Sequence, residues 1–118
     1  MSELLTKAFE LGVSTVELSN YIKKENKDFP LMQRLLKCGT GISISLRIAA
    51  ALPEYTRGFY MDVIKQAEEF QCLMELMVVT GVLTKRQGEP LIADSQFIKE
   101  KALKLIKSNT MNKKCGGN

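Results

Sequence analysis

The sequence predicts an all-α protein, an up-down-up-down bundle of four helices that forms a single domain over residues 1–110. Three prolines, Pro30, Pro53 and Pro90, divide the 118 residues into four pieces, each long enough for one helix. Each piece carries apolar residues at the three- and four-residue spacing that gives a helix an apolar face. Residues 111–118 are expected to form a disordered basic tail.

The first helix is expected from Ser2 to about Asn26. Ser2 can cap its start, and Glu3 suits the positive end of the helix dipole. Two neighbouring apolar stripes together predict a wide face turned towards the core. They are Leu5, Phe9, Val13 and Val16 on one stripe, and Leu4, Ala8, Leu11, Leu18 and Ile22 on the other.

The second helix is expected from Pro30 to Ala51, with Pro30 in its first turn. Small residues alternate here with large aliphatic ones. Two pairs spaced i,i+4, Gly39/Ser43 and Gly41/Ser45, predict a packing seam that admits a close helix or a second subunit. Because glycine costs about 1 kcal/mol in a helix interior, a strand over residues 40–46 is an open alternative. No second strand-like segment exists to pair with it.

The third helix is expected from Arg57 or Gly58 to Val79, ended by Gly81. Its predicted core stripe comprises Tyr60, Val63, Ile64, Ala67, Phe70, Met74, Met77 and Val78. From residue 72 to 79 only Glu75 is charged, and a helix that is apolar nearly all round is buried on more than one side. A contact with another subunit is therefore predicted for Leu73, Leu76 and Val79.

The fourth helix is expected from Pro90 to Thr110, because Glu89, the residue before a proline, disfavours helical geometry. Its inner stripe comprises Leu91, Ile98, Ala102 and Leu105, with Ile106 nearby. Its lysines face largely outward.

The net charge of +4 is unevenly placed, because residues 84–118 hold 8 basic and 3 acidic side chains while residues 1–83 are nearly balanced. Such asymmetry indicates either a polyanionic partner or a solvated helix face with a basic tail. The residues predicted to contact a nucleic acid are Lys85, Arg86, Lys101, Lys104, Lys107, Lys113 and Lys114.

Side chains for catalysis are scarce. The chain has no histidine and three widely spaced cysteines; Cys38 and Cys72 are expected to be buried and Cys115 to lie in the tail. The GTGISIS segment matches no nucleotide-binding fingerprint. We expect no enzymatic activity, no metal and no cofactor. Without an apolar run of membrane-spanning length, we expect a cytoplasmic protein that does not bind a membrane.

The order of the helices and the second helix resemble the four-helix-bundle family of 23S rRNA intervening-sequence proteins. That family's second helix carries a pattern close to Q-L-x-R-S-x-T-S-I-x-x-N-I-x-E-A. Here Thr40 and Ile42 match its T-S-I core, with Gly41 between them. Gln33 stands near the family glutamine, Lys37 and Cys38 stand for its arginine and serine, and Phe59 matches a phenylalanine that opens the third helix. Ala67 with Glu68 and Glu69 resembles the family's alanine-and-acid segment in a shifted register, whereas Ser45 and Ile48 replace the asparagine and the glutamate.

This resemblance implies a non-enzymatic bundle in a ring-like homo-oligomer, because some family members are homopentamers. A related bundle is the accessory protein of diversity-generating retroelements, a basic pentamer that engages a reverse transcriptase and nucleic acid. Through that relative, RNA or DNA and a reverse transcriptase-like protein become candidate partners. The alternative is a protein–protein interaction scaffold or accessory subunit that binds no nucleic acid.

Overall fold

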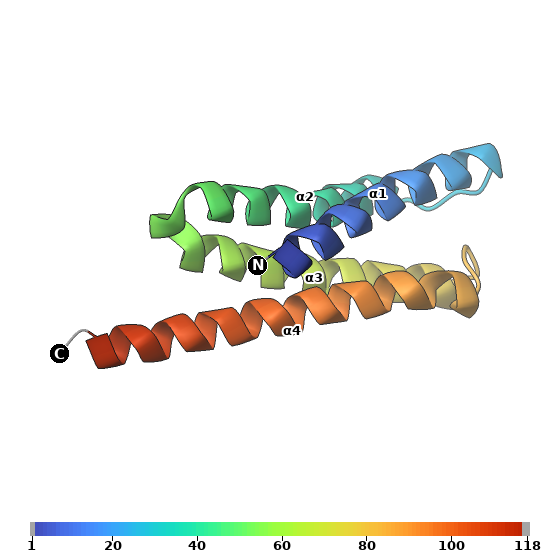
Figure 1. Ribbon diagram of the computed structural model, residues 1–118. Coiled ribbons are helices and arrows are strands. Elements are labelled where there is room, and N and C mark those ends of the chain that lie inside the picture. The colour runs from blue at the N-terminus through green and yellow to red at the C-terminus, as the bar shows by residue number, and fades with distance from the viewer. Residues whose placement is uncertain (1, 117–118) are drawn as a thin grey trace.

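A computed structural model describes the backbone of residues 2–116 and the side chains of residues 3–108. It contains four long helices and one short 3-10 helix: α1 (Ser2–Lys24), α2 (Met32–Ala51), η1 (Pro53–Tyr55), α3 (Thr56–Val79) and α4 (Lys85–Gly116). Neighbouring helices run antiparallel, and each long helix packs on two others, while α1 and α3 lie diagonally and do not contact each other (Figure 1). The predicted all-α four-helix bundle is confirmed.

Helices α1 and α3 end in the same way, with a residue of positive φ that reverses the chain. Asn26 has φ 55° and Gly81 has φ 83°. After α3, the N–H of Gly81 donates to the carbonyl of Val78 (3.1 Å), and that of Val82 donates to Met77 (2.9 Å). This pair of bonds is the Schellman motif, which satisfies the last carbonyls of a helix. The predicted end at Gly81 is therefore confirmed.

Helix α4 begins five residues before Pro90, so the predicted start at Pro90 is wrong. Thr84 and Gln87 form a capping box: the Thr84 hydroxyl accepts from the Gln87 N–H (3.1 Å), and the Gln87 side chain accepts from the Thr84 N–H (2.9 Å). This cap starts the helix early enough that Pro90 falls in its second turn. The T-x-x-Q spacing at residues 84–87 was the sequence signal for it.

Helix α2 is continuous from Met32 to Ala51, so the open strand alternative is wrong. It begins two residues after Pro30, which lies in the preceding turn. Its glycines recover their propensity cost by admitting close neighbours from both sides, as described below.

The core is a single apolar cluster along the bundle axis. The predicted core stripe of α3 is confirmed at Tyr60, Val63, Ala67, Phe70, Met74 and Met77, and that of α4 at Ile98, Ala102 and Ile106. The two predicted stripes of α1 differ in outcome. One is buried at Leu4, Ala8, Leu11 and Ile22, whereas the other is exposed at Phe9, Val13 and Val16.

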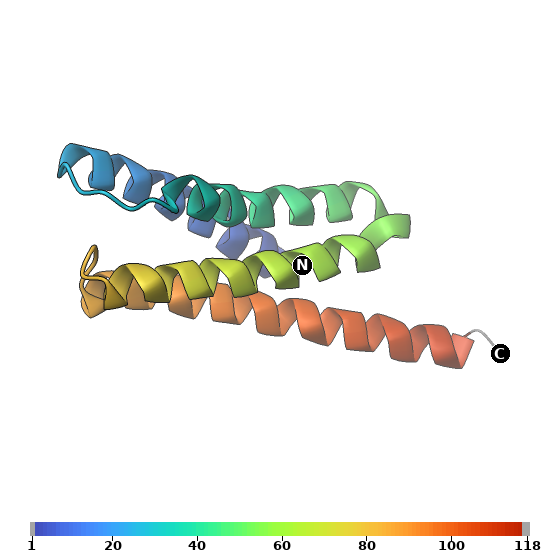
Figure 2. The same cartoon turned by 180° about the vertical axis from the view of Figure 1, so that it is seen from behind.

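The reason for this difference is the path of α1, which runs obliquely across α2 (Figures 1 and 2). The start of α1 lies near the middle of the bundle's length, so the end that holds η1 is built from α2, α3 and α4 alone. The bundle measures 58 × 24 × 22 Å along its principal axes. Within the described residues, no helix is long and apolar enough to span a membrane.

Helix α4 continues to Gly116, into the segment where the sequence predicts a disordered tail. The side chains of residues 109–116, and residues 117 and 118 altogether, lie outside the described part of the chain. Lys113, Lys114 and Cys115 fall there. Disorder over residues 111–118 stays a prediction.

Candidate binding surfaces

The small residues of α2 divide between its two neighbours. A Cβ added at Gly39 would come within 2.7 Å of Thr15 Cγ2 and 2.9 Å of Thr15 Cβ, both on α1. A Cβ added at Gly41 would instead overlap the end of the Gln66 side chain on α3. The seam predicted at Gly39 and Gly41 is thus a pair of contacts inside one chain, with α1 on one side and α3 on the other.

The remaining two small residues also lie on opposite sides. The Ser45 hydroxyl accepts a hydrogen bond from Gln66 Nε2 at 3.1 Å, which helps to close the α2–α3 boundary. Ser43 faces α1, where a Cβ added at Gly12 would lie 3.9 Å from the Ser43 Cβ. The two sides of α2 therefore pack through different small residues.

Several residues of the family-like pattern gather on the α2–α3 boundary, where they line a depression of about 870 Å³. Arg34 Nε donates to Glu69 Oε2 at 2.7 Å, and this hydrogen bond, with the charge of Glu69, raises the pKa of the guanidinium. The Cys38 thiol is buried as predicted, and its desolvation raises its pKa to about 11. The depression is lined by Gln33, Arg34, Leu36, Lys37, Cys38, Thr40, Gln66 and Glu69.

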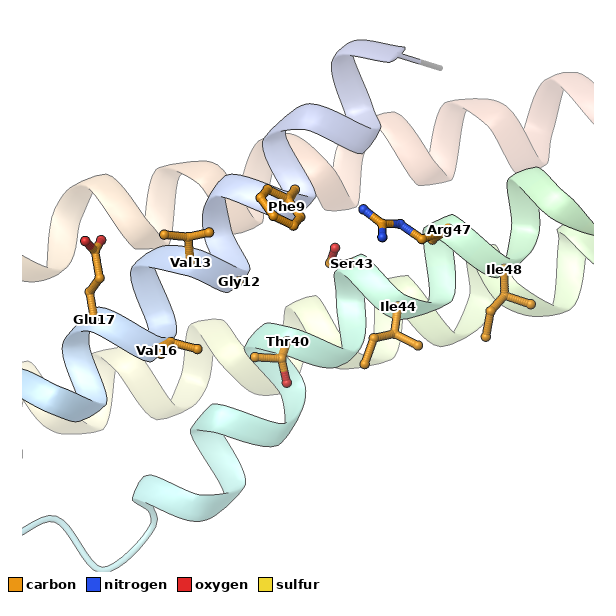
Figure 3. Close-up of a pocket in the computed structure, with 10 residues that line it drawn as sticks. All are labelled: Phe9, Gly12, Val13, Val16, Glu17, Thr40, Ser43, Ile44, Arg47 and Ile48. Carbon is orange, nitrogen blue, oxygen red and sulfur yellow. The ribbon is translucent and has the colours of Figure 1, made fainter.

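An apolar groove opens on the other side of α2, between this helix and α1. We call it the α1–α2 groove; it encloses about 490 Å³ and is lined by Phe9, Gly12, Val13, Val16, Glu17, Thr40, Ser43, Ile44, Arg47 and Ile48. Figure 3 shows α1 and α2 diverging towards Phe9 and Arg47, with Gly12 and Ser43 between the two rows of larger side chains. Small residues therefore form the floor of the groove, and larger side chains form its rim.

The rim residues are too exposed to belong to the core. Phe9 is 53% exposed, Ile44 59%, Val16 44% and Val13 43%. Sequence periodicity placed three of these four in the core, because a 3.6-residue pattern identifies an apolar side of a helix without identifying what covers it. Exposed apolar patches of this kind mark interaction sites on soluble proteins.

Two charges flank the groove. The Arg47 guanidinium lies 5.8 Å from the centre of the Phe9 ring, a cation–π distance. Glu17 lies at the opposite end (Figure 3). Among the side chains of residues 3–108, neither charge forms an ion pair.

A second exposed apolar surface lies on α3. It consists of Cys72, Leu76 and Val79, and we call it the α3 face. Leu76 is 41% exposed and Val79 84%, and the Cys72 thiol is exposed, so the predicted burial of Cys72 is wrong. The ion pairs of Glu69 with α2 and Glu68 with α4 bracket this outer side of the helix.

Leu73, which the sequence grouped with these residues, is buried in the bundle core and only 4% exposed. It follows Cys72 by one position, and a 100° turn of the helix carries it from the outer side to the inner one. Of the three residues predicted to contact another subunit, only Leu76 and Val79 are exposed.

The basic residues of α4 do not form one patch. Lys85 and Arg86 lie at the start of the helix, and Lys104 and Lys107 lie about 28 Å further along, at 1.5 Å per residue. Lys101 lies 3.9 Å from Glu3 and 6.0 Å from the Phe97 ring centre. Lys104 and Lys107 are exposed, and no described acidic side chain pairs with either.

Among the described side chains, residues 3–108, no three or more Cys, Asp or Glu residues lie together in a way that could hold a metal ion.

Comparison with solved structures finds proteins of similar fold. No family model matches the chain, and no curated protein does. A crystal structure of a protein of unknown function from the S23 ribosomal protein family of Bacteroides thetaiotaomicron superposes with a TM-score of 0.83 and 26% sequence identity. The match covers 88% of this chain and 98% of that one. It confirms the resemblance seen in the sequence: the chain is similar in structure to a protein of the S23 ribosomal protein family.

Proposed function

We propose that this protein is a non-catalytic helical bundle that associates with copies of itself. The observation that carries the proposal is the apolar surface outside the core, namely the α1–α2 groove and the α3 face. Each square ångström of apolar surface removed from water contributes about 25 cal/mol to association. Homo-oligomers, which the family resemblance implies, use such surfaces to form their subunit interfaces.

Self-association is tested by measuring the mass of the purified protein with light scattering over a dilution series. The expected result is a species heavier than the 13.2 kDa chain that dissociates on dilution. A mass equal to that of one chain at every soluble concentration would overturn the proposal. The pentameric stoichiometry implied by the resemblance stays a prediction that the same measurement decides.

A second function, nucleic-acid binding, is favoured by the outward lysines of α4. Lys104 and Lys107 lie one turn apart and are exposed, and the helix continues towards Lys113 and Lys114. Neither ammonium group forms an ion pair with a described carboxylate, so both can pair with phosphates, and such contacts release counterions and make binding salt-dependent. Lys101 is the weaker candidate, because it already lies beside Glu3.

The nucleic-acid proposal is tested with a double variant, Lys104→Glu with Lys107→Glu, and fluorescence anisotropy of labelled RNA. We expect weaker binding and a salt dependence reduced by about 0.7 to 0.9 in log–log slope per lost phosphate contact. The matched control is Lys23→Glu with Lys24→Glu at the end of α1, which makes the same change in charge elsewhere.

Wild-type protein that binds no RNA at low salt would remove this function. An equal loss of binding in the control would show that net charge, rather than α4, is responsible. The same assay with labelled DNA compares the two candidate nucleic acids. A reverse transcriptase-like partner stays a prediction.

A further inference from the structure

We infer that the α1–α2 groove of one copy receives the α3 face of a second copy. This inference rests on the proposed self-association and names the two surfaces that meet. The groove and the α3 face are different surfaces on different sides of the bundle, since α1 and α3 are diagonal and do not contact each other. One contact between unlike surfaces would cover both of them.

The apolar residues of the groove rim and of the α3 face have the same spacing along their helices. Along α1 the rim residues are Phe9, Val13 and Val16, spaced i, i+4, i+7, and the α3 face repeats this spacing at residues 72, 76 and 79. Each row spans about 10 Å of helix. A helix that presents an i, i+4, i+7 row is the ligand that an apolar groove between two helices accepts.

The shapes also agree. Gly12 and Ser43 keep the groove floor low, and the larger side chains of the rim stand on either side (Figure 3). Leu76 and Val79 project from α3 as branched aliphatic side chains that the bundle leaves 41% and 84% exposed. Two grooves facing each other would instead bring rim against rim and leave the α3 face in water.

The charges beside the two surfaces are complementary. Arg47 flanks the groove, and exposed Glu75 flanks Leu76 on α3. Neither is in an ion pair with any other side chain of residues 3–108. Charge complementarity of this kind sets the orientation of an interface more than its affinity.

A contact between unlike surfaces has a consequence for assembly. Two copies joined in this way still have one free groove and one free α3 face between them, so the contact repeats and closes into a ring or continues as a filament. A contact between like surfaces would stop at two copies. The two arrangements can therefore be separated by breaking each surface in a different variant.

The test uses Ile44→Lys, which breaks the groove, and Leu76→Lys, which breaks the α3 face. Both sites are exposed, at 59% and 41%, so both variants are expected to fold, with helical circular dichroism equal to wild type. Leu103→Lys on α4, at a site 38% exposed and outside both surfaces, is the matched control and should keep the wild-type mass.

Light scattering should give one-chain mass for each of the two variants alone. Mixed in equal amounts, they should form a species of two chains, 2 × 13.2 kDa, because the intact groove of one variant accepts the intact α3 face of the other. Neither variant can extend that pair, so no larger species should form.

Each other outcome overturns the inference. If Ile44→Lys or Leu76→Lys keeps the wild-type mass, the surface it alters is not in the interface, and self-association stands without this pairing. A mixture that stays at one-chain mass excludes contact between the two surfaces. A control that dissociates shows that the loss is not specific to them. Wild-type protein of one-chain mass removes the proposed self-association as well, which distinguishes the two failures.

Discussion

Small residues lie on two sides of α2 and have a different neighbour on each side: α3 runs alongside α2, whereas α1 crosses it obliquely. Towards α3, Gly41 and Ser45 meet the polar side chain of Gln66, which donates a hydrogen bond to Ser45 across the boundary. Towards α1, Gly39 meets Thr15 at the crossing point, but beyond it the helices diverge and Ser43 becomes part of a groove floor. The same residue types thus lie against a polar, hydrogen-bonded side chain on one side and border an apolar groove on the other.

Small residues permit a close approach between two helices, whereas the crossing angle of the helices sets the length over which they stay in contact. Removing Cβ atoms permits backbones to approach, but an oblique neighbour uses that freedom at one point only. What lies beyond the crossing point is left for solvent or for another molecule. Three experiments test this contrast, described in order of decreasing expected effect.

The largest effect is expected from truncating an aliphatic side chain on each side of α2. Leu46→Ala removes a fully buried side chain and should lower the free energy of unfolding by about 2 to 5 kcal/mol. Ile44→Ala, in the groove, should cost less than about 1 kcal/mol, because this side chain is already 59% exposed. Urea denaturation at a dilution where the chain is monomeric measures both, and equal losses would contradict the contrast.

An intermediate effect is expected from adding a methyl group at each seam glycine. Gly39→Ala drives a Cβ into the branched side chain of Thr15, and overpacking of about 1 to 3 kcal/mol should exceed the helix-propensity gain of about 1 kcal/mol.

Gly41→Ala provides the paired measurement. The obstacle there is the end of the flexible Gln66 side chain, which can move aside at the cost of its hydrogen bond to Ser45. Gain and loss should nearly cancel, so little change in thermal midpoint is expected. A larger loss at Gly41 than at Gly39 would mean that α2 and α3 hold the more rigid contact.

The smallest effect concerns reactivity rather than stability. Burial raises the pKa of the Cys38 thiol to about 11, so below that pH it is mostly protonated, and the thiolate is the reactive form. Exposed Cys72 should therefore be alkylated first by iodoacetamide at pH 8, as read by peptide mass spectrometry. At a dilution where the chain is monomeric, so that the α3 face is free, this reaction should leave the melting temperature unchanged. Equal rates at the two cysteines would show that the α2–α3 boundary opens readily.

Much of the bundle could be predicted from particular residues. Gly81 marked the end of α3, and the buried stripe of α3 followed from its spacing. The start of α4 was missed because Pro90 outweighed the T-x-x-Q cap before it, although a proline in an early helical turn is tolerated more readily than one in the middle. The candidate site was predicted only in part: Leu76 and Val79 were expected at a surface, while Phe9, Val13 and Val16 were assigned to the core.

Spacing and propensity are local properties, so they indicate the four helical segments, the apolar side of each helix and the places where small residues permit close approach. The oblique path of α1 across α2, which leaves Phe9, Val13 and Val16 exposed, is a property of the tertiary structure. Coverage depends on where a neighbouring helix runs, and residues far apart in the chain set that path together. The groove could therefore not be predicted from the pattern of either helix alone, because it forms only where α1 and α2 diverge.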